Sequence, residues 1–324
     1  MTHAIVLHAP GGPEQLRWEE VEVGEPGAGE LRVRHTAIGV NFHDTYVRSG
    51  SYRTLPLPGI PGVEAVGIVE RVGPGVEGFK PGDRIAYINE KYGGYAEARL
   101  LPAHLALHLP STLSDLDAGA LTVKGLTACL LLRRVHAVRA GEKVLIHAAA
   151  GAMGQLLVRW AHRLGATVFA TAGSAAKARI AAECGAHHVI RYREEDFVAR
   201  VKALSGGTGV DVVYDGVGAD TFSGSLDCLA YLGTLVNFGQ SSGPVPPFAV
   251  GRLAVRSNTL IRPLLFHYIR DRASLEALAN EAFDAMESGV LPASIGLTLP
   301  LSRAGEAHTA LESRATSGAI VLTP

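Results

Sequence analysis

Cysteine is scarce in this chain, and its few copies lie far apart. The 324 residues include only Cys129, Cys184 and Cys228, in stretches that read as apolar or helical. No Cys-x-x-Cys pair occurs, and an odd, sparse set of this kind favours buried, reduced thiols over a disulfide framework. Reduced thiols are typical of the cytosol. We therefore expect a cytoplasmic protein.

The sequence also lacks an excess charge of either sign and a long hydrophobic run. Lys and Arg total 30 against 31 Asp and Glu, a formal net charge of -1, so neither nucleic acid nor an acidic membrane surface is indicated as a partner. The most apolar segments are interrupted by Lys124, His147 and Arg159, and none reaches the roughly 20 apolar residues that span a bilayer. The N-terminus lacks a basic start followed by an apolar run, so we expect no signal peptide.

The residues that are present suffice for two folded cores. Hydrophobic residues make up 47% and charged residues 19%, as in folded soluble proteins, and a chain of this length is expected to form two domains. From residue 1 to about 121 the chain reads as short strands broken by glycine and proline, with little helical periodicity; examples are 31–40, 65–73 and 81–88. This pattern predicts a β-rich domain, a partly open barrel.

From about Thr122 to Phe266 the pattern changes to strands that alternate with helices. This alternation predicts a doubly wound parallel sheet of the Rossmann type. A later helix at 275–289 and an amphipathic segment at 300–314 are expected to return to the first domain, which gives a discontinuous domain of residues 1–121 plus 267–324 and an inserted domain of residues 122–266. The predicted strands of the inserted domain are 143–149, 167–172, 187–192, 209–218, 233–240 and 258–266, and the helices between them are 154–165, 175–185, 194–206 and 220–232.

A glycine-rich loop follows the first of these strands. Ala149, Gly151 and Gly154 have the spacing of Gly-x-Gly-x-x-Gly, with alanine in the first place. A buried strand precedes the loop and an apolar helix follows it, which is the context that a dinucleotide-binding loop requires. We expect the helix N-terminus to receive the pyrophosphate, and a plain strand-to-helix turn is the alternative.

The second strand of this unit ends without the acidic residue that holds the ribose of NAD. Gly173 and Ser174 precede Lys177 there, and Tyr192 ends the next strand. A small neutral pocket with a lysine suits a 2′-phosphate, which a carboxylate would repel, so NADPH is predicted over NADH. Arg179 has two interpretations, a second phosphate contact or a solvated helix charge.

Metal ligands are sparse in the first domain. It contains no cysteine, and His43 with Glu64 is the one pairing of note. A catalytic zinc needs three protein ligands, and no third ligand accompanies this pair. We therefore expect an enzyme that works without metal.

The order and spacing of motifs along nearly the whole chain resemble the quinone oxidoreductase (zeta-crystallin-like) branch of the medium-chain dehydrogenase/reductase superfamily. The motifs are GGPE (11–14), NFHDTYVRSG (41–50), PGVEAVGIV (61–69), PGDRIAY (81–87), KGLTA (124–128), HAAAGAMG (147–154), YREEDF (192–197), VYDGVG (213–218), SLDCL (225–229), FGQSSGPVPPF (238–248), IRPLLFHYI (261–269) and LESR (311–314).

The resemblance implies a GroES-like, β-rich catalytic domain, an inserted Rossmann domain, NADPH in the cleft and a homodimer that pairs the edge strands around 258–266. Zinc-containing relatives carry a cysteine at the place of Asn41 and a histidine in the motif that here reads Gly62, Val63 and Glu64. They also carry a four-cysteine lobe, which this sequence lacks.

Matching motif positions imply a set of cofactor contacts. This sequence departs from the commonest pattern at Met153, where valine is usual, and at Gln240, where asparagine is usual. The implied contacts are Asn41, Phe42, Asp44, Tyr46 and Thr127 for nicotinamide and ribose; Ala152 and Met153 for pyrophosphate; Gly173, Ser174, Lys177 and Tyr192 for the 2′-phosphate; Val217, Gly239, Gln240, Ser241 and Ser242 along the nicotinamide half; and Arg262, Phe266 and Arg314 to close the site.

The reaction predicted from this resemblance is NADPH-dependent, zinc-independent reduction of small quinones. Hydride transfer needs positioning and hydrogen-bond donors more than acid-base residues. Tyr46 and Tyr52 are the catalytic candidates, because a phenol can donate a hydrogen bond and its ring can stack on a planar substrate. Packing in the wall of the site is the alternative role. Asn41 would orient a carbonyl, a ribose or a water, and Asp44 is expected to be a structural hydrogen-bond partner.

Three other functions stay open at this point. One is reduction of an enone or alkenal double bond by the same site. Another is a non-catalytic NADPH-binding role, since relatives serve as lens crystallins or bind RNA. A zinc alcohol dehydrogenase is the least favoured, because its ligands are missing.

Overall fold

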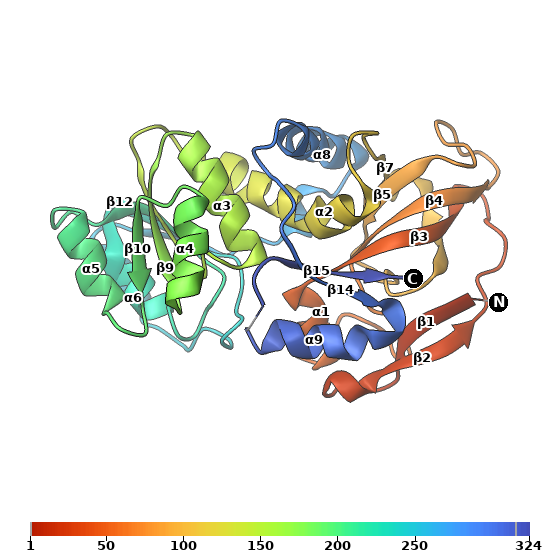
Figure 1. The fold of residues 1–324 in the computed structure, drawn as a ribbon, viewed down its shortest axis with the longest axis horizontal. Coiled ribbons are helices and arrows are strands. Elements are labelled where there is room, and N and C mark those ends of the chain that lie inside the picture. The colour runs from red at the N-terminus through yellow and green to blue at the C-terminus, as the bar shows by residue number, and fades with distance from the viewer. Residues whose placement is uncertain (1, 315) are drawn as a thin grey trace. The chain divides into compact units, whose positions relative to one another are not determined.

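A computed structural model describes residues 2–314 and 316–324. The chain forms two compact units. The first consists of Met1–Gly125, Asp271–Glu287 and Ala293–Pro324, and the second of Leu126–Arg270 with Ser288–Pro292. In Figure 1 the first unit therefore combines red and orange segments from the start of the chain with blue segments from its end.

The first unit is built on a mostly antiparallel sheet with the strand order β14-β15-β3-β4-β5-β7, to which β6 adds by pairing with β3. A separate hairpin joins β1 to β2. The strands are β1 Thr2–Leu7, β2 Leu16–Val21, β3 Glu30–Val40, β4 Glu64–Val72, β5 Arg84–Ile88, β6 Ala98–Pro102, β7 Ala106–His108, β14 Ile295–Pro300 and β15 Ala319–Thr323; the helices are α1 Phe42–Arg48, α2 Asp115–Cys129, which continues into the second unit, α8 Arg272–Glu287 and α9 Ala304–Glu312.

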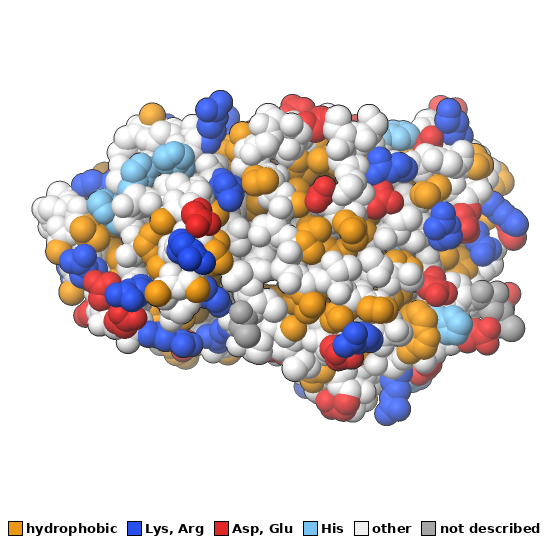
Figure 2. All heavy atoms as spheres, viewed as in Figure 1, with side chains coloured by type: hydrophobic (Ala, Val, Ile, Leu, Met, Phe, Trp, Pro, Cys, Tyr) orange, Lys and Arg blue, Asp and Glu red, His pale blue; other side chains and the backbone are white. Residues whose placement is uncertain are grey.

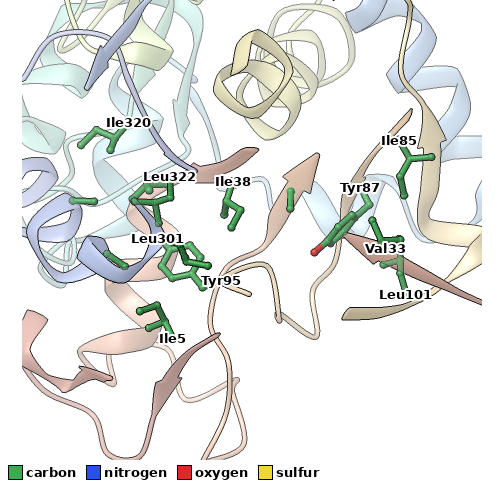
Figure 3. Close-up of a cluster of buried hydrophobic side chains, with 14 of the residues drawn as sticks. Ile5, Val33, Ile38, Ile85, Tyr87, Tyr95, Leu101, Leu301, Ile320 and Leu322 are labelled. Carbon is green, nitrogen blue, oxygen red and sulfur yellow. The ribbon is translucent and has the colours of Figure 1, made fainter. Parts of the chain in front are cut away.

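One hydrophobic core explains why the two ends of the chain fold together in this unit. Ile320 and Leu322 of β15 alternate onto the same face and pack with Ile38 of β3, as Figure 3 shows. Leu301 joins Tyr95 in the same core. Each buried aliphatic side chain of this kind contributes about 1.5–3 kcal/mol.

The expectation of little helix before residue 121 is wrong at two places. α1 has only seven residues, which is too short for a visible helical period. α2 is buried on most of its surface between residues 118 and 129, so it shows no polar stripe to alternate with an apolar one.

The second unit contains a parallel sheet with the strand order β10-β9-β8-β11-β12-β13. The predicted Rossmann architecture is confirmed. Figure 1 shows α3 and α4 beside β9. The strands are β8 Lys143–Ile146, β9 Thr167–Ala172, β10 His188–Arg191, β11 Val210–Asp215, β12 Leu229–Asn237 and β13 Thr259–Ile261; the helices are α3 Ala152–Arg163, α4 Ala175–Glu183, α5 Phe197–Leu204, α6 Phe222–Cys228 and α7 Leu265–Tyr268.

One predicted helix and one predicted strand of the second unit end earlier than the sequence indicated. The helix predicted over 220–232 stops at Cys228, because Leu229 already begins β12 and pairs with Val210. The strand predicted over 258–266 stops at Ile261, since Pro263 has no N–H to continue the ladder, and α7 follows.

None of the described helices is long and apolar enough to cross a bilayer.

Candidate functional site

Most predicted cofactor-binding residues of the second unit lie where parallel strands end. The strand order reverses between β8 and β11, and ligands of such sheets bind outside the carboxyl ends of the strands at this reversal. The predicted residues at these ends are Ala152 and Met153 after β8, Gly173, Ser174 and Lys177 after β9, Tyr192 after β10, Val217 after β11, Gly239, Gln240, Ser241 and Ser242 after β12, and Arg262 after β13.

The loop after β8 brings the start of α3 close to the strand. Gly151 donates its N–H to the carbonyl of Ala148 over 2.9 Å. A Cβ on Gly154 would lie 2.3 Å from the Ala148 oxygen and 2.6 Å from the Ala149 Cα, so only glycine fits there. The first turn of α3 therefore directs backbone N–H groups, including that of Met153, toward the end of the sheet.

A buried polar chain that the sequence did not indicate lies behind this loop. Ser225 Oγ donates to Asp215 Oδ2 over 2.9 Å, so it accepts from His147 Nε2 at 3.0 Å. His147 Nδ1 then accepts from Thr171 Oγ1 at 3.0 Å. Burial lowers the pKa of His147, and the charge of Asp215 offsets only part of this shift. A lowered pKa fits a neutral imidazole. The chain ties β8, β9, β11 and α6 together at the carboxyl ends of the strands.

The residues predicted for a 2′-phosphate are brought together after β9 and β10. Ser174 caps α4 by accepting the N–H of Lys177 over 3.3 Å. A Cβ on Gly173 would lie 2.8 Å from the hydroxyl of Tyr192, so the two residues form one small surface. Burial, and then the charge of Arg193, lowers the pKa of Lys177. Arg193, which follows Tyr192 in the YREEDF motif, was not among the predicted contacts.

Arg179, which had two interpretations, forms an ion pair with Glu183 one turn along α4 at 3.7 Å, and its side chain is 77% exposed. The structure therefore supports the solvated helix charge.

The loops after β11, β12 and β13 also hold each other. Ser242 donates its backbone N–H to the carbonyl of Val217 over 2.8 Å. Arg262 donates to Gln240 Oε1 over 2.8 Å and contacts Asn237 at the end of β12. Arg262 thus holds the loop at Gly239 and Gln240 in place by hydrogen bonds to both residues.

The other predicted contacts lie outside these strand ends. Thr127 is near the end of α2 and Phe266 is in α7. Arg314 lies in the first unit just after α9, exposed and with a φ of 54°.

In the first unit, aromatic rings gather around α1. Tyr46 and Tyr52 meet edge to face with ring centroids 5.1 Å apart, and the centroid of His43 is 5.4 Å from that of Tyr52. Phe42 lies 6.2 Å from Tyr46 by the same measure. Tyr52 also lines a cavity of about 340 Å³, together with Pro10, Val47, Gly50, Arg53, Leu55 and Leu57.

His43 and Glu64 have separate partners. His43 Nε2 lies 3.2 Å from the hydroxyl of Tyr92, and burial lowers the pKa of His43 to about 4. Glu64 instead accepts from Asn41 Nδ2 over 2.7 Å. Among residues 2–314 and 316–324, no group of three His, Cys, Asp or Glu side chains is arranged to hold a metal ion.

Asp44 is fully buried in α1. Its Oδ2 accepts from the Asn41 N–H over 2.9 Å and from the Tyr95 hydroxyl over 3.2 Å, and the same hydroxyl lies 2.9 Å from His308 Nε2. Within the described part of the chain, Asp44 Oδ1 has no hydrogen-bond partner. Burial raises the pKa of Asp44 to about 7, and the charge of Glu64 adds to this rise.

A parallel sheet with a glycine-rich loop, together with a β-rich unit that carries an aromatic cluster, defines a two-domain, dinucleotide-binding protein. Residues 27–111 match the family model "Alcohol dehydrogenase GroES-like domain", and residues 152–281 match the model "Zinc-binding dehydrogenase".

Full-length relatives narrow this class. The chain is 43% identical to quinone oxidoreductase 1 of Escherichia coli (strain K12), with 100% of both chains covered. It is 44% identical to a 2-haloacrylate reductase of a Burkholderia species, with 100% of this chain and 99% of the relative covered. The crystal structure of the Escherichia coli quinone oxidoreductase complexed with NADPH superposes with a TM-score of 0.96 at 43% identity, covering 99% of this chain and 100% of the other. The chain belongs to the quinone oxidoreductase family of the medium-chain dehydrogenases/reductases, which confirms the predicted family and the enzyme class.

Proposed function

We propose that this chain is an NADPH-dependent quinone oxidoreductase that reduces small quinones without a zinc ion. Membership of the family supports the reaction class. The proposal that no zinc ion takes part is supported by the separate partners of His43 and Glu64, and by the lack of three side chains arranged to hold a metal ion among residues 2–314 and 316–324. The observation that carries the choice of cofactor is the surface after β9 and β10, where the cations Lys177 and Arg193 lie within electrostatic reach of each other. Two cations suit a phosphate dianion, whereas a neutral ribose hydroxyl gains less from them.

The residues of the second unit fit NADPH as a whole. The first turn of α3 at Ala152 and Met153 would bind the pyrophosphate, and Gly173, Ser174, Lys177 and Tyr192 would bind the 2′-phosphate, with Arg193 added. When bound, NADPH supplies the hydride. The fully buried Asp44 would act on the cofactor only through Asn41, whose backbone N–H it accepts. The remaining predicted contacts keep their proposed roles: Asn41, Phe42, Tyr46 and Thr127; Val217, Gly239, Gln240, Ser241 and Ser242; and Arg262, Phe266 and Arg314.

The first unit would bind the acceptor. The rings of Tyr46 and Tyr52 offer a planar quinone an apolar wall, and the cavity beside Tyr52 has room for a ring substituent. Their hydroxyl groups are proposed to donate hydrogen bonds to the oxygen that becomes negative during hydride transfer. The first unit would thus form the catalytic domain and the second unit the NADPH-binding domain. The predicted bounds, 1–121 plus 267–324 and 122–266, differ from those of the compact units by a few residues at each junction and by the short segment Ser288–Pro292, which belongs to the second unit.

A second candidate function is reduction of a conjugated double bond beside a carbonyl or carboxyl group. The 44% identity to a 2-haloacrylate reductase favours it. A non-catalytic NADPH-binding protein is the third candidate.

The proposed assembly is a homodimer through the edge strand β13. In the described residues, β13 pairs with β12 on one side and with no strand on the other. Tyr231, Leu232 and Val255 are each at least 75% exposed, and the Leu232 N–H donates to the Arg256 carbonyl over 2.8 Å. An open strand edge near exposed apolar side chains favours pairing with a second copy.

We propose no nucleic-acid or membrane partner and a cytoplasmic location. The face in Figure 2 mixes Lys and Arg with Asp and Glu side chains, whereas nucleic-acid binding needs a concentrated basic surface. The three cysteines are buried thiols, as suits a reducing compartment.

A panel of acceptors separates the candidate functions. Turnover with NADPH is measured for 9,10-phenanthrenequinone, 1,4-benzoquinone and a simple enone. The proposal expects the two quinones to be the better substrates by kcat/KM. Turnover with the enone alone would support the double-bond reductase, and tight NADPH binding without turnover of any acceptor would support the non-catalytic role.

A further inference from the structure

Lys124 is a buried lysine of the first unit. It is not among the predicted cofactor contacts or catalytic candidates. It lies in α2, and its side chain is only 8% exposed. The Nζ atom is 2.9 Å from Asn41 Oδ1, 3.2 Å from the Val40 carbonyl and 3.7 Å from Glu64 Oε1. The Asn41 and Val40 oxygens accept two of the three N–H groups of an ammonium ion, and the Glu64 carboxylate lies at ion-pair distance from the same nitrogen.

Glu64 completes the arrangement from β4. It is 1% exposed, and its Oε1 accepts from Asn41 Nδ2 over 2.7 Å. Its Oε2 accepts from the backbone N–H of Val123 over 2.7 Å. A buried carboxylate is tolerated when its oxygens are paired in this way.

These two charges fix the orientation of the Asn41 side chain. Lys124 can only donate a hydrogen bond and an ionised Glu64 can only accept one, so the amide cannot exchange its oxygen and nitrogen. One N–H of Asn41 Nδ2 is taken by Glu64. For the second N–H the structure records no partner among residues 2–314 and 316–324, and Asn41 is only partly buried. Asn41 therefore presents a hydrogen-bond donor, and not an acceptor, at the start of the helix that carries Tyr46.

We propose that Lys124, together with Glu64, is a positioning residue that holds Asn41 as a one-way hydrogen-bond donor to the carbonyl oxygen of the acceptor. The ammonium ion beside Oδ1 also polarises the amide, which strengthens its N–H as a donor when the carbonyl oxygen gains negative charge. This inference rests on the proposed function and adds to it a residue that touches neither cofactor nor acceptor.

A double-mutant cycle tests whether Lys124 acts through Asn41. The variants are Lys124→Met, Asn41→Ala and the double variant, with Lys80→Met as a matched control at an exposed lysine. Loss of a preorganised donor lowers kcat/KM for 1,4-benzoquinone by about 100-fold. We expect each single variant to approach that loss, the double variant to stay within about threefold of Asn41→Ala, and the NADPH affinity of Lys124→Met to be nearly unchanged, since Lys124 does not touch the cofactor. Independent, multiplying losses, or an unaffected Lys124→Met variant, would overturn the proposal.

The substitution Lys124→Met removes the cation beside Glu64. A buried charge left alone is strongly destabilising, so this variant can fail to fold. In that case Glu64→Gln/Lys124→Met, which removes both charges, replaces it in the same cycle.

A second measurement reads the orientation without turnover. Hydrogen exchange of the Asn41 side-chain amide is followed by ¹⁵N NMR, with the signal assigned by its loss in Asn41→Ala. We expect exchange to be at least tenfold faster when Lys124 is replaced, and not in Lys80→Met. Unchanged exchange would refute the positioning role even if quinone turnover were confirmed. Absence of quinone turnover in the unaltered chain, with faster exchange in the variant, would contradict the proposed function and leave the positioning of Asn41 supported.

Discussion

Replacing Asp44 by asparagine should change how stability depends on pH. Burial raises the pKa of this carboxyl from its ordinary value of 3.8 to about 7. Between these two values the native state holds a proton that the unfolded chain has lost, so the free energy of unfolding falls as pH rises from about 4 to 7. Each pH unit in that window is worth about 1.4 kcal/mol, and the full loss is about 4 kcal/mol. Above pH 7 both states are ionised and the loss is constant.

The side-chain amide introduced by Asp44→Asn resembles the protonated acid and does not titrate. Its buried NH₂ group lacks a partner at any pH, a constant cost of about 1–3 kcal/mol. The free energy of unfolding is measured with urea for both proteins at pH 5 and pH 8. The value for the variant minus the value for the unaltered chain should rise by about 3 kcal/mol between the two pH values. Asp284→Asn, at an exposed position, should show no such change. A difference in unfolding free energy that is the same at both pH values would refute the burial argument.

Three further predictions concern the cofactor loops and the acceptor wall. Lys177→Ala and Arg193→Ala should each lower kcat/KM for NADPH by about tenfold or more while leaving NADH nearly unaffected; an equal loss with both cofactors would contradict the phosphate assignment. Gly154→Ala should abolish NADPH binding or folding because of the close approach of its Cβ to the loop backbone, while Gly251→Ala, with open space around it, should leave the thermal midpoint and NADPH titration unchanged. Tyr52→Phe should lower kcat for quinones by about three- to tenfold, since one hydroxyl donor contributes about 1 kcal/mol; unchanged kinetics would assign Tyr52 to wall packing.

The sequence predicted the parallel sheet well because its strands are buried on both faces and read as apolar runs separated by helices. Val144, Leu145 and Ile146 of β8 are such a run, and each is fully buried. The loop after β8 was equally readable, since the close approach at Gly154 tolerates no side chain. Helices α1 and α2 were missed because one is short and the other is buried without a polar stripe.

The polar chains around the candidate site were not predictable from local pattern. His147 meets Ser225 across 78 residues of sequence and Lys124 meets Asn41 across 83, so only the folded sheet and helices bring them together. Each residue alone reads as an ordinary polar position. Their partners, and hence the direction in which Asn41 donates, follow from the packing of α2 against β3 and β4.

The central claim is tested most directly by NADPH oxidation with 1,4-benzoquinone after the protein has been stripped of metal with a chelator. The account predicts full quinone-dependent turnover by the stripped protein, with kcat/KM for NADPH at least tenfold above that for NADH. Turnover that disappears on chelation and returns with zinc, or a preference for NADH, would contradict it.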